Sequence, residues 1–374
     1  MGITIVEVTS KKQLRQFVAF PLRLYKGHPY FVPPLNFDEL NTLQKKINPA
    51  FDHCEARYWL AYKNNEIVGR IAGIYNKAYV AKWKRAYMRF GWIDFIEDTE
   101  VVRALMNTVE AWAKEKGLAA VHGPLGFTDL DYEGMLVEGY DERGTMATIY
   151  NYPYYPKLME ELGYVKDVDW IEYRVNVPDQ TPEYIHKIAE LVKRRYQLNV
   201  VHLKSAKDIL PYAKDIFRLV NETYSELYGV VELTDKQAAY YTKMYFSMVK
   251  KDFVTLITDK HNKLICFGLT MPSLSAALQK AKGSLFPFGF VHLLKALKKN
   301  DEADMYLVAI DKEYQGKGVN ALLMQQTNIA FNKFGIQYAE TNPELEVNEK
   351  VQSIWEHYVA RQHKRRRCFI KQLQ

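Results

Sequence analysis

The chain has 374 residues, of which 48% are hydrophobic and 25% are charged. This balance is typical of an ordered globular protein and excludes an intrinsically disordered chain, while the length favours two domains over one core. The net charge of +7 favours anionic ligands. Nucleic acid is not expected as a partner, because the sequence has no zinc-finger spacing, aromatic RNA-binding motif or basic heptad helix.

Cysteine and histidine usage predicts neither disulfides nor a metal site. Cys54, Cys266 and Cys368 are far apart in the sequence, and such isolated thiols favour a reducing cytoplasm. The nine histidines show no metal-ligand spacing. Residues 1–8 are typical of a strand rather than a signal peptide, and no apolar run reaches the roughly 18–20 residues that span a bilayer. We therefore expect a cytoplasmic protein without a metal.

Hydrophobic periodicity predicts the same order of elements in both halves of the chain. Each half has a hairpin, a third strand, an amphipathic helix, a strand after a glycine, a second helix and a last strand. In the first half these elements are residues 58–74, 89–96, 102–112, 117–121, 155–162 and 170–175. In the second half they are residues 253–270, 305–310, 319–330, 335–339, 347–360 and 367–371. With a proline-rich link at 177–182, this order predicts a duplication, with domains at 1–180 and 181–374.

The turn between strand 305–310 and the next helix has the composition of a phosphate-binding loop. It contains Gln315, Gly316, Lys317 and Gly318. The glycines permit positive φ and close approach of a ligand, and the first N–H groups of the helix are unpaired at the positive end of its dipole. The turn therefore predicts a receptor for phosphate oxygens, with an ordinary strand-to-helix turn as the alternative.

This order of elements, with a Gln-x-x-Gly turn after the third strand, resembles the GNAT acyltransferase superfamily, whose members bind acyl-coenzyme A. In their signature, Arg/Gln-x-x-Gly-x-Gly/Ala, backbone amides hold the pyrophosphate at the start of a helix. Gln315 and Gly318 match the signature, whereas Asn320 stands where glycine or alanine is usual. The resemblance implies an α/β (α+β) protein of two tandem GNAT-like domains, each a mixed, largely antiparallel sheet flanked by helices.

Nearly the whole chain is similar to a bacterial tandem-GNAT branch, including segments 27–34, 123–134 and 151–155. Some relatives in this branch are described as ceramide-synthase-like enzymes that acylate long-chain sphingoid bases. The first half departs from the pattern, since residues 95–100 lack glycine and carry three carboxylates that suit helix capping and would repel a pyrophosphate. We expect the first domain to have the fold without the cofactor.

The resemblance implies an acyl-CoA-dependent N-acyltransferase in which an amine attacks the thioester directly. The backbone of Val308 and Ala309 is expected to bind the pantetheine amides and the thioester oxygen. The other expected cofactor contacts are Gln315, Gly316, Lys317, Gly318, Val319, Asn320 and Asn348. The expected acceptor is a small-molecule or lipid amine near the domain interface, and the sequence does not fix the oligomeric state.

Direct acyl transfer needs a base, a dipole for the oxyanion and an acid near the leaving thiolate. Glu340 is the expected base; its rivals are Glu232, Asp304 and Glu346. Trp355 stands where many relatives carry a general-acid tyrosine. Tyr358, three residues further on, is the substitute candidate, with a packing role as the alternative.

Two further segments carry unusual chemistry. Loop 123–133 combines glycines and a proline with Asp129, Asp131 and Glu133; it predicts either an acceptor-binding loop that holds a cationic amine or an elaborate structural loop. Residues 284–299 are aromatic and apolar at the front, then amphipathic and basic. They predict either contact with a membrane interface or lipid chain, or a helix packed in the cleft between the domains.

Two other functions fit the same sequence. A Fem-like aminoacyl-tRNA-dependent transferase pairs two such folds and suits the positive charge, but the chain shows no coiled-coil arm. A non-catalytic protein that binds a ligand or another protein is the third hypothesis, because Asn320 and Trp355 depart from the family pattern.

Overall fold

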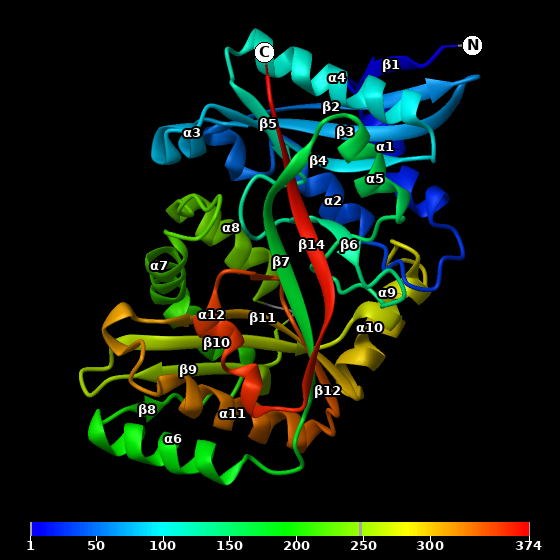
Figure 1. Cartoon of the computed structure of the whole chain (residues 1–374). Helices are drawn as coiled ribbons and strands as arrows, with labels where there is room; N and C mark the ends of the chain where they lie inside the picture. The colour runs from blue at the N-terminus through cyan, green and yellow to red at the C-terminus, as the bar shows by residue number, and fades with distance from the viewer. Residues whose placement is uncertain (1, 247–248, 374) are drawn as a thin grey trace.

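A single mixed sheet of 14 strands runs through the described part of the molecule (Figure 1). The structure is a computed structural model that describes residues 2–246 and 249–373, without the side chain at 350. Along the sheet the strands follow the order β1-β2-β3-β4-β5-β14-β7-β12-β11-β10-β9-β8, while β6 pairs with β14 and β13 with β7. The predicted mixed, largely antiparallel α/β architecture is confirmed.

The longest strands lie in the middle of the sheet, where β7 and β14 have 12 and 13 residues. The strands of the first half are β1 (Thr4–Glu7), β2 (Cys54–Lys63), β3 (Glu66–Asn76), β4 (Tyr87–Phe95), β5 (Ala120–Gly123), β6 (Met135–Glu138) and β7 (Val165–Asn176). Those of the second half are β8 (Asn199–Val200), β9 (Val254–Thr258), β10 (Leu264–Pro272), β11 (Glu302–Ile310), β12 (Tyr338–Thr341), β13 (Glu344–Leu345) and β14 (Ala360–Gln372).

Helices cover both faces of the sheet (Figure 1). The α-helices are α1 (Lys11–Leu24), α2 (Asn36–Thr42), α3 (Lys77–Trp83), α4 (Thr99–Glu115), α5 (Tyr154–Glu161), α6 (Glu183–Arg195), α7 (Ala213–Tyr224), α8 (Asp235–Tyr245), α9 (Ser275–Ala281), α10 (Gly289–Lys298), α11 (Val319–Phe334) and α12 (Glu349–Gln352). Short 3-10 helices are η1 (Pro49–Asp52), η2 (Ala206–Tyr212), η3 (Lys251–Phe253), η4 (Lys312–Tyr314) and η5 (Trp355–His357). Of the helices described, none combines the length and the apolar character that crossing a membrane requires.

The two halves of the sheet repeat one plan. The hairpins β2–β3 and β9–β10 are antiparallel, and each is extended by an antiparallel third strand, β4 or β11. A parallel strand follows in both, because β4 pairs with β5 and β11 with β12. β4 carries an extra residue between Gly91 and Asp94, and β11 carries one at Tyr306. Such bulges bend a strand, and their equivalent positions support the predicted duplication.

The C-terminal strand crosses from one half to the other. β14 lies between β5 and β7, and residues 369–372 pair with β5 while residues 360–370 pair with β7. In Figure 1 the red β14 and the green β7 run together between the lower and upper parts of the molecule. β7 also pairs with β12 through residues 174–176. The two long strands therefore join the sheets, and residues 360–372 complete the sheet of the first half.

Equivalent amphipathic helices cover the two hairpins. α4 packs on the first hairpin with Val101, Leu105 and Val109 fully buried. α11 packs on the second with Val319 and Leu322 each 1% exposed. Burying one such side chain stabilises the fold by roughly 1.5–3 kcal/mol. The apolar stripes predicted for these helices are confirmed.

The helix predicted over residues 347–360 is wrong for most of its length. α12 ends at Gln352, η5 covers Trp355–His357, and β14 already begins at Ala360, well before the strand predicted at 367. The chain becomes extended because Ala360 pairs with Val175 and the following residues continue along β7. Tertiary pairing thus outweighs the local helix preference of this segment.

Candidate active site

The loop before α11 leaves backbone amides without an acceptor. β11 ends at Ile310, η4 makes one turn, and Gly316 and Gly318 take positive φ values of 71° and 84°. Gly318 precedes α11, which has no side-chain cap. Within residues 2–246 and 249–373, the N–H groups of Gly316, Gly318, Val319 and Asn320 have no hydrogen-bond acceptor. They lie at the positive end of the helix dipole and form a receptor for anionic oxygens.

Side chains around this loop add charge and fix its shape. The ammonium group of Lys317 lies 5.5 Å from the ring centres of Tyr196 and Tyr314. Gln315 donates from Nε2 to a backbone carbonyl of β11 at 3.0 Å. The side chain of Asn320, which departs from the family signature, is exposed. The structure thus brings the predicted loop residues together around the free amides, and their binding of a cofactor stays a prediction.

β11 and β12 diverge beside the loop. They pair only over residues 302–305 and 338–341, so the rest of β11 has one edge without a strand partner among the described residues. Val308 is 38% exposed on this edge, whereas Ala309 is buried. The hydroxyl of Tyr224, at the end of α7, donates to the Val308 carbonyl at 2.9 Å and accepts from its N–H at 3.3 Å. Tyr224 therefore engages the backbone groups predicted for pantetheine, a role that no sequence motif indicated.

Two carboxyl groups with raised pKa values lie near Tyr224. Burial raises the pKa of Glu344, on β13, to about 8, and the indole N–H of Trp355 donates to this carboxyl at 3.0 Å. Burial also raises the pKa of Asp129, in the loop after β5. Burial raises the pKa of Tyr224 and the charges of Asp129 and Glu344 raise it further, so both carboxyls are within electrostatic reach of the hydroxyl. A carboxyl that titrates near neutral pH suits general-base catalysis.

Glu340, the predicted base, is paired with buried cationic side chains. Its Oε1 contacts Nζ of Lys364 and lies 3.5 Å from Nε2 of His363. Burial alone would raise the pKa of Glu340, but the charges and hydrogen bonds of Lys364 and His363 together outweigh burial and lower the pKa. A carboxylate with a lowered pKa is a weak base. Its strand neighbour Asp304, a predicted rival, differs because burial raises its pKa to about 7.

The other two predicted rivals form ion pairs. Glu232 binds Lys82 of α3 at 2.8 Å. Glu346 binds Arg365 of β14 at 2.9 Å. The first pair links the second half to the first and the second pair joins Glu346 to β14, which favours a structural role for these carboxylates.

Tyr358 and Asn348 lie on the segment after β13. Tyr358 follows η5, and its hydroxyl accepts from the Asn328 side chain of α11 at 3.3 Å. Its ring packs near Trp355, with centres 6.2 Å apart. Asn348 precedes α12 as its N-cap residue. These contacts show packing for Tyr358, and the catalytic and cofactor roles of both residues stay predictions.

The equivalent backbone groups of the first half are bonded to its own residues. The carboxylate of Asp98 caps α4 and accepts from a first-turn amide at 2.9 Å. On β4, the Phe90 carbonyl accepts from the amide of Leu125 at 2.8 Å. The Phe95 amide donates to the hydroxyl of Tyr155 at 2.9 Å. A carboxylate thus caps α4 where the amides at the start of α11 have no acceptor among the described residues, which supports the prediction of a fold without a cofactor loop.

Two relatives align with this chain along nearly its whole length. Protein YghO of Escherichia coli (strain K12) is 28% identical over 371 residues, which is 97% of this chain and 94% of that protein. Bacterial ceramide synthase of Caulobacter vibrioides is 25% identical over 383 residues, which is 99% of this chain and 98% of that protein. No profile of a known protein family matches the sequence.

Solved structures decide the fold. A tandem GNAT protein from the clavulanic acid biosynthesis pathway superposes with a TM-score of 0.59 at 11% identity, covering 99% of this chain and 98% of that one. The chain has the tandem GNAT fold. A GCN5-related glucosamine N-acetyltransferase region of a fungal multi-domain enzyme gives a TM-score of 0.58 at 10% identity, covering 99% of this chain and 38% of that one. The fold expected from the Gln315–Gly318 turn and the duplication is confirmed.

In this tandem GNAT fold, loop 123–133 joins the two halves. The hydroxyl of Thr128 lies 2.9 Å from that of Tyr241 on α8. Asp131 accepts from the Thr128 amide at 3.0 Å, which is a structural bond. Burial and the charge of Asp129 raise the pKa of Glu133 well above its usual value. Asp131 therefore stabilises the loop itself. Binding of the acceptor amine by Asp129 and Glu133 stays a hypothesis.

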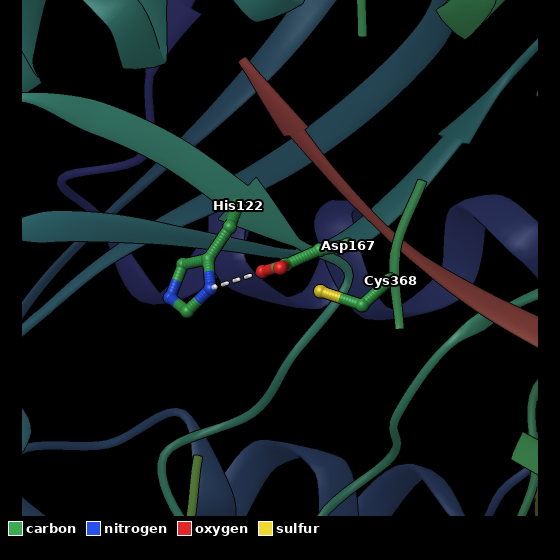
Figure 2. Close-up of side chains that lie close together, drawn as sticks. All are labelled: His122, Asp167 and Cys368. Carbon is green, nitrogen blue, oxygen red and sulfur yellow. Dashed lines mark ion pairs between the residues drawn. The ribbon is translucent and has the colours of Figure 1, made fainter. Parts of the chain in front are cut away.

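One group of side chains on β5, β7 and β14 has the spacing of metal ligands. Figure 2 shows the imidazole of His122 turned toward the carboxylate of Asp167, with the thiol of Cys368 beside it. The hydroxyl of Tyr228 lies 3.0 Å from Nδ1 of His122 and 3.4 Å from Sγ of Cys368. It also donates to Asp167. A protein hydroxyl thus already occupies the space between these three groups.

A second group in the described residues consists of Glu172, Glu340 and His363. Nζ of Lys364 contacts Glu340 and lies 3.6 Å from Glu172. The cationic partner of this group is therefore a lysine of the chain itself.

Proposed function

We propose that this tandem GNAT chain is an acyl-CoA-dependent N-acyltransferase and that residues 181–374 bind the acyl-CoA. The observation that carries the proposal is the set of amides at Gly316, Gly318, Val319 and Asn320 that have no acceptor among the described residues, beside the open edge of β11. A pyrophosphate would accept from these amides, and Lys317 would add a charge-assisted contact. The half at residues 1–180 is proposed not to bind the cofactor, since Asp98 fills the equivalent place.

The pantetheine arm is proposed to lie along Val308 and Ala309, with Asn348 as a further cofactor contact. The hydroxyl of Tyr224 bonds both backbone groups of Val308. It would have to turn away from Val308 before a pantetheine amide could pair there. Tyr224 would therefore act as a gate on this part of the cleft.

For the chemistry, we assign the general base to Glu344 in preference to Glu340. The acceptor ammonium gives a proton to the Glu344 carboxylate, and the amine nitrogen then bonds to the thioester carbonyl carbon. The carbon–sulfur bond breaks, the nitrogen loses its second proton to give the neutral amide, and the leaving thiolate takes up one proton to give the free thiol of coenzyme A, so that the net proton released is the one held by Glu344. Asp129 would attract the cationic acceptor beforehand, and Tyr358 stays the predicted acid.

The acceptor amine is proposed to bind where loop 123–133 of the first half meets Tyr224 and Glu344 of the second. The relative from Caulobacter vibrioides is named bacterial ceramide synthase, so a long-chain amino alcohol is the first acceptor class to test. A fatty acyl-CoA is correspondingly the first donor to test. The three cysteines are buried and unpaired, which fits the proposed cytoplasmic location.

Titration calorimetry with acetyl-, octanoyl- and palmitoyl-CoA tests this proposal. We expect at least one donor to bind, and Lys317→Glu to weaken that binding by about tenfold or more, because it places a negative charge beside the pyrophosphate. Lys207→Glu, on an exposed position of η2, makes the same charge change and should bind like the parent chain. Thiol release after addition of a long-chain amine measures transfer. Failure of every donor to bind would reject the proposal, as would equal binding by the two variants.

A further inference from the structure

An aromatic surface projects from the segment between α9 and α10. Phe286 and Phe288 are 78% and 72% exposed, and Phe290 and Leu294 on α10 are 40% and 60% exposed. The rings of Phe286 and Phe290 have centres 5.9 Å apart, so these residues form one patch. The alternative of a helix packed into a cleft describes only the inner face of α10, where Leu293 is buried.

All the charged side chains of this segment are basic. Residues 273–300 contain five lysines and no aspartate or glutamate. Each is exposed and none forms an ion pair with another described residue; they are Lys280, Lys282, Lys295, Lys298 and Lys299. Lysine stems can lie along apolar surface while their ammonium groups reach polar headgroups. Exposed aromatic residues flanked by unpaired lysines have the composition of an interfacial anchor.

The segment is held against the first half of the chain. The side-chain amide of Gln279 on α9 donates to the Pro29 carbonyl at 2.7 Å, and the amide of Asn36 donates to the Gly283 carbonyl at 2.8 Å. Asn36 begins α2, whose next residue, Phe37, is 42% exposed. The patch is therefore bonded to both halves of the chain. Binding to a surface through the patch would fix the orientation of the whole molecule relative to that surface.

We propose that this patch docks the protein on an anionic lipid bilayer, with the phenylalanines among the acyl chains and the lysines against the headgroups. A cluster of exposed aromatic side chains of this kind marks an interaction site. Insertion removes the phenylalanine cluster from water, which favours binding to the bilayer. The attraction between lysine and anionic lipid strengthens this binding. The inference does not rest on the proposed activity, because docking needs neither acyl-CoA nor an acceptor.

Vesicle flotation tests the aromatic part of the patch. The intact chain should float with vesicles of phosphatidylethanolamine and phosphatidylglycerol and much less with phosphatidylcholine alone. Replacing the three phenylalanines with serine should weaken binding by about tenfold or more; these changes are Phe286→Ser, Phe288→Ser and Phe290→Ser. The matched control replaces three apolar residues outside the patch, which are 60%, 55% and 53% exposed, and this variant should bind like the parent chain. Its changes are Val165→Ser, Leu191→Ser and Ile329→Ser. Circular dichroism verifies that each variant is folded.

A second pair of variants tests the charges. Reversing three lysines of the patch should lower vesicle affinity by about a hundredfold or more; the changes are Lys295→Glu, Lys298→Glu and Lys299→Glu. A control with the same net charge should keep the affinity; it carries Lys11→Glu, Lys12→Glu and Lys114→Glu. No flotation of the intact chain, or equal losses in patch and control variants, would overturn the proposal. A patch variant that changes only the oligomeric state would overturn it too, since the surface would then be a protein contact.

Discussion

Glu344 has the environment of a general base, because its carboxyl is largely removed from water, bonded to one indole N–H and titrates near neutral pH. Only the deprotonated form can accept a proton from the acceptor amine. With a pKa of about 8, the rate of acyl transfer should rise with pH and level off above that value. Glu344→Gln should lower kcat by about a hundredfold or more and abolish this rise. A pH–rate profile at saturating acyl-CoA measures both effects.

Glu340→Gln is the matched comparison for the base. The Glu340 carboxylate contacts the buried ammonium group of Lys364, so its loss should lower Tm by weakening an ion pair in the sheet. The rise of rate with pH should remain. The opposite pattern, with the rise lost in Glu340→Gln and kept in Glu344→Gln, would return the role of base to the residue that the sequence predicted.

Tyr224 should compete with acyl-CoA for the backbone of Val308. Each of its two hydrogen bonds contributes about 0.5–1.5 kcal/mol net, and a pantetheine amide has to displace them. Tyr224→Phe should therefore lower the Kd for acyl-CoA by about fivefold or more in titration calorimetry. Tyr212→Phe is the control, since its hydroxyl has no hydrogen bond to a described residue. Weaker binding by Tyr224→Phe would show that the hydroxyl holds the ligand instead of excluding it.

The equivalent helices α4 and α11 begin in different ways. Asp98 caps α4 and pairs with Lys63 at 2.7 Å, whereas Gly318 leaves α11 without a side-chain cap. Loss of an N-cap carboxylate costs about 1 kcal/mol, so Asp98→Ala should lower the free energy of unfolding by about that amount in urea denaturation. Its affinity for acyl-CoA should not change. A fall in affinity would place the ligand in the first half and contradict the proposed division of roles.

Local patterns predicted the elements whose two faces differ in polarity, namely the hairpins β2–β3 and β9–β10 and the helices α4 and α11. The turn at Gln315–Gly318 was visible because its backbone needs glycine. The extended course of β14 was not, since it depends on pairing with β7 far upstream. The roles of Tyr224 and Glu344 could not be predicted from the sequence for a related reason. Their chemistry comes from burial beside Val308 and Trp355, and the fold alone creates these contacts.

The basic residues of β14 fasten the two halves of the molecule together. In the sequence, residues 364–367 form a cluster of positive charge near the C-terminus. In the fold, Lys364 and Arg366 are 1% exposed and face Glu172 of β7. Arg367 binds Asp169 of the same strand at 2.8 Å. Partners far upstream in the sequence thus neutralise this cluster, which makes it structural and removes it as a site for anionic ligands.

Because β7 and β14 belong to both halves of the sheet, we expect the molecule to unfold as one cooperative unit, with equal calorimetric and van't Hoff enthalpies. Arg366 and Glu172 form a buried ion pair at 2.5 Å, and removing one partner costs about 3–5 kcal/mol. Arg366→Ala should therefore lower Tm while keeping a single transition. Arg361→Ala, in the same strand but 57% exposed at its side chain, should cost about 1 kcal/mol or less. Two transitions, with one unmoved by Arg366→Ala, would show that the halves unfold independently despite the shared strands.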